Sequence, residues 1–347
     1  CMKKKKENGS SIISILLLVC IIAGVLLIGK ILWPKSDKQD LAYKNYMIEE
    51  GSIEENEAVN YYYNQLEEPE KIMYATILAN EDKLKTGNEK IDFPADLSDS
   101  IKETGGSSEN NYFQTAWDAI SLDHLDLFYV NTDSLALTTR TTSALGFKSY
   151  EFTLKPKDGI SYYNSTFTSK EQIIEAMNDV EAMANTIVAG ARGSRYDKVK
   201  YVHDWIVDNV EYDTKKLANN DNIYGTFVNK KVVCEGYAEG LKYLLDKLNI
   251  PCVLVYGTGY DSEGKSEAHA WNYVKMEDDK WYAVDPTWDD PIYENGSAIF
   301  ANLEEDKHQY FLKGAKTFNK NHVSDGDVSE TGQDFVYPEL SETDYKR

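Results

Sequence analysis

The stretch VCEGYAEGLKYLLDKL, residues 233–248, decides how the rest of the chain is interpreted. Its apolar side chains recur at helical spacing, so residues 234–248 are predicted to form a helix that begins at Cys234. The unpaired N–H groups and the dipole at a helix start favour a thiolate there. Gly236 and Gly240 allow other parts of the chain to approach this helix start closely. The apolar stripe consists of Tyr237, Ala238, Leu241, Leu244, Leu245 and Leu248.

Three strands are predicted after this helix. Pro251 opens the first strand, and the acidic turn 277–279 joins the second strand to the third. Neighbouring strands lie about 4.8 Å apart, so a carboxylate on one strand can reach an imidazole on the next. The predicted strands are residues 252–257, 268–276 and 280–284.

Cys234, His269 and Asp285 form the constellation that carries chemistry. His269 lies in the second predicted strand, and Asp285 follows the third. Each alone is usually structural, and Asp before Pro is commonly a turn former. Together, in this order, they supply a thiol nucleophile, a base and a group that orients the base. We expect the sheet face to present the imidazole to the helix.

The motifs around these residues resemble the transglutaminase-like superfamily. The matching pieces are Val-Cys-Glu-Gly-Tyr-Ala at 233–238, His-Ala-Trp-Asn at 269–272 and Trp-Tyr-Ala-Val-Asp-Pro-Thr-Trp-Asp-Asp-Pro at 281–291. An upstream helix at 202–212, and Tyr310-Phe-Leu with the later His322, resemble flanking segments of the same family. The resemblance covers roughly residues 168–325.

This resemblance implies an α+β fold with a papain-like transglutaminase core, in which a Cys-bearing helix packs on an antiparallel sheet. It implies Cys234 as the nucleophile, His269 as the general base and acid, and Asp285 as the orienting carboxylate. The thiolate would attack a protein or peptide amide and form an acyl-enzyme, with the Cys234 N–H as one oxyanion donor. Trp271 and Trp288 line the substrate cleft in one interpretation and are core aromatics in the other.

Three outcomes stay open for this site. Hydrolysis, as in a cysteine protease or amidase, is slightly favoured over amine transfer, because the chain lacks a calcium-site pattern. The alternatives are a true protein-crosslinking transglutaminase and a non-catalytic peptide- or wall-binding module of the cell envelope. No cofactor is expected, and five His without close pairing argue against a metal site.

The N-terminal 36 residues predict a membrane anchor. Lys3 to Lys6 form a basic run, and residues 12–29 carry no charge over a length that spans roughly one bilayer. The positive flank is expected to stay in the cytoplasm and the rest of the chain outside it. We therefore expect an uncleaved, single-pass signal anchor in a bacterial cell membrane, with residues 12–29 contacting lipid and the catalytic domain extracytoplasmic.

Composition and charge limit the partners. The 347-residue chain is 42% hydrophobic and carries a net charge of −21, with six of its lysines in residues 1–36. Such an acidic body repels phosphate backbones, so nucleic acid is excluded and a peptide or wall polymer at the envelope is favoured. We divide the chain into the basic tip and anchor (1–36), a mostly helical extracytoplasmic region of unknown role (37–130) and the transglutaminase-like domain (131–347).

Periodicity predicts the remaining elements. Ser169 with Gln172 three residues later fits a capping box at a helix start. Helices are predicted at 54–84, 112–122, 169–189 and 194–210, a loop at 87–111, and a β-meander at 125–130, 135–142 and 149–154.

Overall fold

The computed structural model describes residues 43–44, 58, 60–103, 109–144, 147–261, 263–290, 292–293, 297–298 and 307–347. Within those ranges, no helix is long and apolar enough to cross a bilayer. The predicted anchor at 12–29 lies outside the described residues, so its prediction stays untested.

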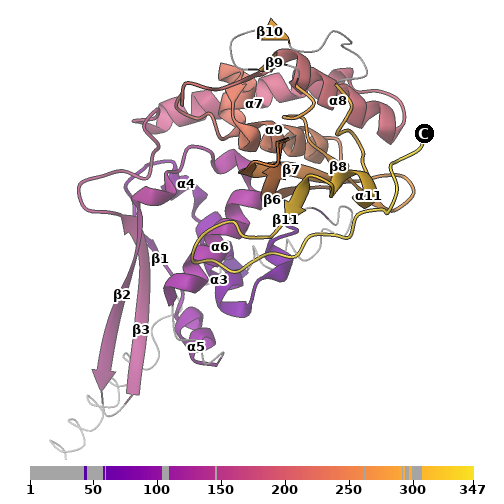
Figure 1. Cartoon of the computed structure of the whole chain (residues 1–347). Coiled ribbons are helices and arrows are strands. Elements are labelled where there is room, and N and C mark those ends of the chain that lie inside the picture. Colours follow the sequence, from indigo (N-terminus) through magenta and orange to yellow (C-terminus); the bar gives the residue numbers. More distant parts are fainter. Residues whose placement is uncertain are drawn as a thin grey trace, which may run out of the picture.

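A four-stranded antiparallel sheet and one central helix organise the C-terminal half (Figure 1). The strands lie in the order β11-β6-β7-β8, and helix α9 (Cys234–Lys247) packs on β6 and β7. The strand bounds are β6 (Cys252–Tyr260), β7 (Ser266–Lys275), β8 (Trp281–Val284) and β11 (His322–Ser324). This arrangement confirms the predicted Cys-bearing helix on an antiparallel sheet.

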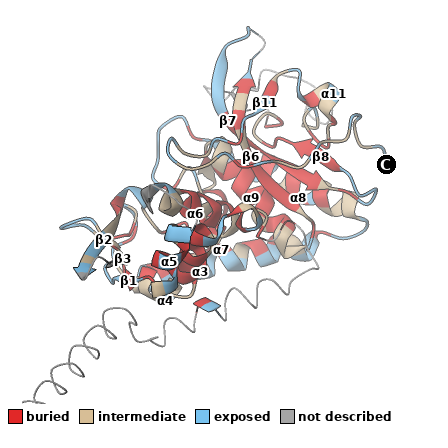
Figure 2. Cartoon of the chain, turned by 90° about the horizontal axis from the view of Figure 1, so that it is seen from below, coloured by how far each residue is buried: buried red, intermediate tan, exposed pale blue. Residues whose placement is uncertain are grey.

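Side chains alternate between the two faces of this sheet. On one face Leu254, Ala270 and Val284 pack under α9. On the other face Val255, Trp271 and Ala283 form a separate apolar cluster with Phe318 of the short helix α11 (Ala315–Phe318). The sheet is therefore buried on both sides, by helices on one and by the C-terminal segment on the other (Figures 1 and 2).

Helices α7 (Lys170–Gly190) and α8 (Arg195–Asn209) pack against α9 and against each other. Both start where the sequence predicts. Ser169 caps α7 by accepting from the Gln172 N–H, and Ser194 forms a full capping box with Asp197 on α8. The Gln172 side chain accepts a hydrogen bond from the Thr168 N–H and not from the Ser169 N–H, so the second bond of the predicted capping box is displaced by one residue.

Short elements lead into α9. A π-helical turn (Gly225–Asn229) precedes β5 (Lys231–Val232), which pairs in parallel with β4 (Glu211–Tyr212). Strands β9 (Ile292–Tyr293) and β10 (Ser297–Ala298) form a separate antiparallel pair.

The N-terminal half is helical with one small sheet. Helices α3 and α6 pack together, and α5 packs on both α3 and the sheet. The strands lie in the order β1-β3-β2, and the β2–β3 hairpin projects from the body (Figure 1). The elements are α3 (Glu68–Leu78), α4 (Glu81–Leu84), β1 (Ile91–Asp92), α5 (Ala95–Glu103), α6 (Glu109–Asp123), β2 (Leu135–Ala144), β3 (Phe147–Pro156) and 3₁₀ turns at Tyr63–Gln65, Leu125–Leu127 and Thr132–Ser134.

Two expectations for this half are wrong. Residues 87–111, expected to be a loop, contain β1 and α5, because Leu97 buries against the core despite a Gly- and Ser-rich surrounding sequence. Residues 125–130, expected to be a strand, begin with a 3₁₀ turn (Leu125–Leu127) in which both leucines are buried, and only Val130 makes an isolated β-bridge, to Tyr163. The helix at 112–122 and the strands at 135–142 and 149–154 are confirmed within α6, β2 and β3.

The two halves share one core. A single cluster of buried apolar side chains runs from Tyr43 to Phe335 and includes residues of α3, α6, α7 and α9. The small sheet also combines β1 with β2 and β3, which lie on opposite sides of residue 130. The proposed division at residue 130 therefore does not coincide with a break in packing.

Candidate active site

Helix α9 presents Cys234 at its first residue. The Cys234 side chain is partly exposed, whereas Cys252, the other cysteine in the described part of the chain, is fully buried. A Cβ on Gly236 would lie 2.5 Å from the Val232 side chain, and one on Gly240 would lie 2.5 Å from Thr226. These two glycines let β5 and the π-helical turn pack directly on the helix start, as the sequence predicts.

His269 and Asp285 meet on one face of the sheet. His269 Nε2 lies 2.7 Å from Asp285 Oδ2, and both side chains are buried. Strand alternation puts His269 on the face of Trp271, opposite the face on which Asn272 bonds α9. The expectation that the helix-covered face presents the imidazole is therefore wrong. Cys234, the first residue of the helix, is nevertheless close enough to His269 to raise the pKa of its imidazole.

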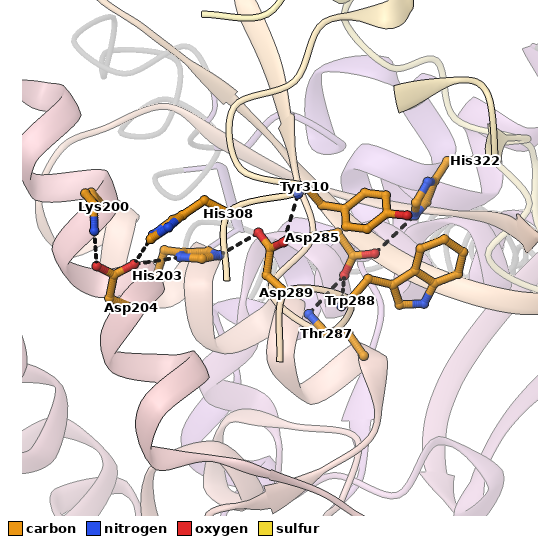
Figure 3. A network of polar contacts seen from close by, with 10 residues as sticks. All are labelled: Lys200, His203, Asp204, Asp285, Thr287, Trp288, Asp289, His308, Tyr310 and His322. Atoms are coloured by element: carbon orange, nitrogen blue, oxygen red, sulfur yellow. Dashed lines mark hydrogen bonds and ion pairs between the residues drawn. The ribbon is translucent and has the colours of Figure 1, made fainter. Parts of the chain in front are cut away.

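The carboxylate of Asp285 has four hydrogen-bonding neighbours. Oδ1 accepts the backbone N–H groups of Thr287 at 2.9 Å and Trp288 at 3.1 Å. Oδ2 faces His269 and also His322 Nε2, at 3.1 Å. Figure 3 shows Asp285 with His322 and with the two backbone donors. The two backbone donors fix the rotation of the carboxylate, so Oδ2 can point only at the two imidazoles.

The electrostatics of this group follow from burial and pairing. Burial disfavours the charged imidazole, but the charge and hydrogen bond of Asp285, with a contribution from Cys234, raise the pKa of His269 to about 10. Burial also disfavours ionised Asp285, yet the two histidines hold the pKa of its carboxyl well below the ordinary value. The arrangement therefore keeps a carboxylate next to an imidazole that accepts a proton readily.

The two tryptophans differ. Trp288 is partly exposed and stacks on His269 with ring centroids 5.1 Å apart at 29°. Trp271 is fully buried and packs 5.7 Å from the Phe318 ring. Trp271 is therefore a core aromatic and not a cleft residue, because the C-terminal segment covers its face of the sheet. Trp288 remains the cleft candidate.

Two features of the surroundings of Cys234 were missed from the sequence. Tyr212 is 43% exposed, and burial of its hydroxyl followed by the neighbouring Cys234 raises its pKa to about 12. Glu235 accepts a hydrogen bond from the Tyr256 hydroxyl, and burial raises its pKa to about 7 despite that bond. Tyr212 thus lies near the thiol, and the residue that follows Cys234 carries a protonatable carboxyl.

A second polar network lies behind Asp285 (Figure 3). His203 is buried between Asp204, at 3.1 Å from Nδ1, and Asp289, at 3.1 Å from Nε2. His308 Nε2 lies 2.7 Å from the same Asp204, which Lys200 also pairs. The Asp289 N–H donates to the Asp285 carbonyl at 3.2 Å, which connects the second network to the first.

Among the described residues, two clusters bring three ligand-type atoms within 4.8 Å of one another. They are His203, Asp204 and His308, and His269, Asp285 and His322. In both clusters the carboxylate oxygen is already hydrogen-bonded to the imidazoles. Proton sharing accounts for this geometry, so it supplies no argument for a metal.

Part of the chain matches a known family model. Residues 181–286, which include Cys234, His269 and Asp285, match the family model of the transglutaminase-like superfamily. This match confirms the resemblance predicted from the motifs and covers less than a third of the chain. No curated protein matches the chain.

Several solved structures match about half of the chain. The crystal structure of a TGase is 18% identical, with a TM-score of 0.30, over 50% of this chain and 50% of that one. A candidate cysteine protease from Cytophaga hutchinsonii is 18% identical, with a TM-score of 0.28, over 48% of this chain and 71% of that one. The periplasmic domain of TgpA from Pseudomonas aeruginosa is 16% identical, with a TM-score of 0.26, over 45% and 63% respectively. The chain thus spans half the length of the first of these structures.

Proposed function

We propose that the chain is a thiol enzyme that acts on protein or peptide amides through Cys234, His269 and Asp285. The observation that supports this most strongly is the 2.7 Å contact between His269 Nε2 and Asp285 Oδ2. It leaves Nδ1 as the ring nitrogen available to Cys234, which is close enough to raise the pKa of His269. A nucleophile, a base and an orienting acid in this order are what acyl transfer requires.

The reaction would proceed in two stages. The Cys234 sulfur, its proton taken by His269, attacks the amide carbon and forms a thioester, while His269 returns the proton to the departing amine. Water then gives a proton to His269 and attacks the thioester, which releases a carboxylic acid and restores the thiol. An amine in place of water would produce a new amide instead. The N–H of Cys234, at the helix start, is the candidate oxyanion donor.

Hydrolysis remains slightly preferred over amine transfer, and a true crosslinking transglutaminase is the alternative within the same chemistry. The alternative of another class is a non-catalytic envelope module that binds a peptide or wall polymer in this cleft. The pairing of a buried imidazole with a carboxylate beside a thiol favours an enzyme, because peptide binding alone does not need a base.

Incubation of the purified chain with casein and a labelled primary amine tests this proposal. New peptide fragments that disappear in Cys234→Ala indicate hydrolysis, and label incorporated into casein that disappears in the same variant indicates transfer. Cys252→Ala is the matched control, since that thiol is buried away from solvent. If neither product forms, and Cys234 alkylates at pH 6–7 no faster than a free cysteine peptide, the binding module replaces the enzyme.

We further propose that this chemistry takes place outside the cytoplasm, with residues 12–29 as the anchor. The basic run before that segment supports this orientation. Protease added to intact cells should remove the domain, whereas it should remain protected if the domain is cytoplasmic.

A further inference from the structure

His322 lies against the same carboxylate oxygen as His269. Its Nε2 is 3.1 Å from Asp285 Oδ2, and its side chain is fully buried. The ring stacks on Phe318 with centroids 3.9 Å apart, and the Trp288 ring centroid lies 4.3 Å away. Strand β11 pairs His322 with Gly259 of β6, two residues from the Gly257 that pairs with His269. The ring is therefore held in place on two sides.

The charge state of His322 follows from its neighbours. Burial and the charge of His269 lower its pKa, although Asp285 acts in the opposite direction. A neutral imidazole carries one N–H and one bare nitrogen. If Nε2 were bare, its lone pair would face the carboxylate at 3.1 Å, so the proton belongs on Nε2. His322 is then a second donor to Asp285 Oδ2.

The other ring nitrogen also has a partner. Asn321 Oδ1 lies 3.0 Å from His322 Nδ1, and Asn321 Nδ2 donates to the Tyr310 hydroxyl at 2.8 Å. A half-turn of the carboxamide, which exchanges these two amide atoms, lets Asn321 donate to Nδ1 and accept from the Tyr310 O–H, and it leaves the proton of the neutral ring on Nε2. Every bond then has one donor and one acceptor, in the direction Tyr310, Asn321, His322, Asp285.

We propose that His322 is a positioning residue of this site, whose Nε2–H shares Asp285 Oδ2 with His269 and so limits how strongly the carboxylate holds the His269 proton. This inference rests on the proposed roles of Cys234, His269 and Asp285. A hydrogen bond to the ionised form of a carboxyl stabilises that form and makes it a weaker base. His269 consequently releases its proton at a lower pH than it would beside Asp285 alone. Returning a proton to a departing amine requires this release.

The charged and titratable groups around this pair come from several elements. Cys234 faces His269 from α9, Asp285 follows β8, and Tyr310 lies in the segment before α11. Asp289 acts on Asp285 from the next turn of the chain. Substitutions at His322 change none of these groups. A shift in the titration midpoint of His269 therefore reports the loss of the His322 N–H donor.

The test is the titration of the His269 ring, followed by ¹⁵N NMR of the full-length chain labelled at histidine, from pH 6 to 11. His322→Phe keeps a flat ring on Phe318 and removes the donor, so the His269 midpoint should rise by about half a unit to one unit. His322→Gln retains a side-chain N–H and should restore most of the difference. Asn321→Ala removes the side chain that contacts His322 Nδ1, which weakens the Nε2–H donor, and should also raise the His269 midpoint. His308→Gln, on Asp204 instead, is the matched control and should leave it unchanged.

A midpoint unchanged in His322→Phe and Asn321→Ala would overturn the inference. So would a rise that His322→Gln fails to reverse, because the effect would then come from ring packing. The proposed function is tested separately by Cys234→Ala, which should lower the His269 midpoint because the thiol group raises it. If Cys234→Ala leaves the His269 midpoint unchanged, the proposed pairing of Cys234 with His269 is wrong. The result for His322 does not depend on that outcome.

Discussion

Asn272 donates its side-chain N–H to the carbonyl of Ala238 at 2.9 Å, which connects strand β7 directly to helix α9. Both residues are fully buried. Asn272 lies three residues after His269 and Ala238 four residues after Cys234, so this bond sets the distance between the helix start and the imidazole.

Replacement of Asn272 by Leu should therefore reduce both stability and thiol reactivity. The side chain keeps a similar volume but loses the bond, and removal of a buried hydrogen bond costs about 1–3 kcal/mol. Urea unfolding measures the first effect and alkylation of Cys234 the second. Wild-type alkylation kinetics in a destabilised Asn272→Leu would show that the bond stabilises the fold without aligning the site.

Asp285→Asn should strongly reduce the amide chemistry. The carboxamide offers one acceptor atom in place of two, and its NH₂ would point at His269 Nε2 or at the backbone donors. In a serine protease the equivalent change lowers kcat by about 10⁴-fold through the wrong imidazole tautomer. We expect a loss of that order in the casein assay, with a cooperative thermal transition retained. Asp204→Asn, in the second network, is the comparison variant, and an equal loss there would indicate a general defect.

The chemistry-bearing elements were predictable because their signals are local. The stripe of α9, the strand patterns of β6 to β8 and the cap Ser169 each lie within one short window of sequence. Cys234, His269 and Asp285 could be connected because strands β7 and β8 are neighbours along the chain as well as in the sheet.

His322 shows why the rest could not be predicted. It lies on a three-residue strand that pairs with β6, more than sixty positions earlier in the chain, so no local pattern places it beside Asp285. The face on which His269 lies was missed for a similar reason. Alternation along β7 puts Asn272 on the face that packs against α9 and His269 on the other face. Cys234 comes near the His269 imidazole only because of where the start of α9 lies relative to the sheet. In α5, burial of Leu97 outweighs a composition typical of loops.

The two cysteines of the described chain should differ in reactivity in the native state. Cys252 is fully buried on β6, and burial raises the pKa of its thiol far above the ordinary value. Alkylation followed by digestion separates the two, since trypsin places Cys234 and Cys252 in different peptides. Cys234 should be labelled in native buffer, and Cys252 only as urea unfolds the chain. Labelling of Cys252 at native-state rates comparable to Cys234 would mean that the sheet opens locally.

Glu235 should make the stability of the chain depend on pH between about 4.5 and 7. Burial raises its folded pKa from the ordinary value of 4.5 to about 7, and the buried Glu239, one turn further along α9, has a raised pKa for the same reason. In this window the folded chain holds a proton that the unfolded chain has released, so stability decreases as the pH rises.

Glu235→Gln removes that titration while keeping an acceptor for the Tyr256 hydroxyl. The variant should therefore lose less stability than the wild type between pH 5 and pH 8, as measured by urea unfolding at each pH. The exposed Glu267→Gln serves as the control on the same face of the molecule. Identical slopes in Glu235→Gln and the wild type would show that Glu235 ionises in the folded chain as readily as in water.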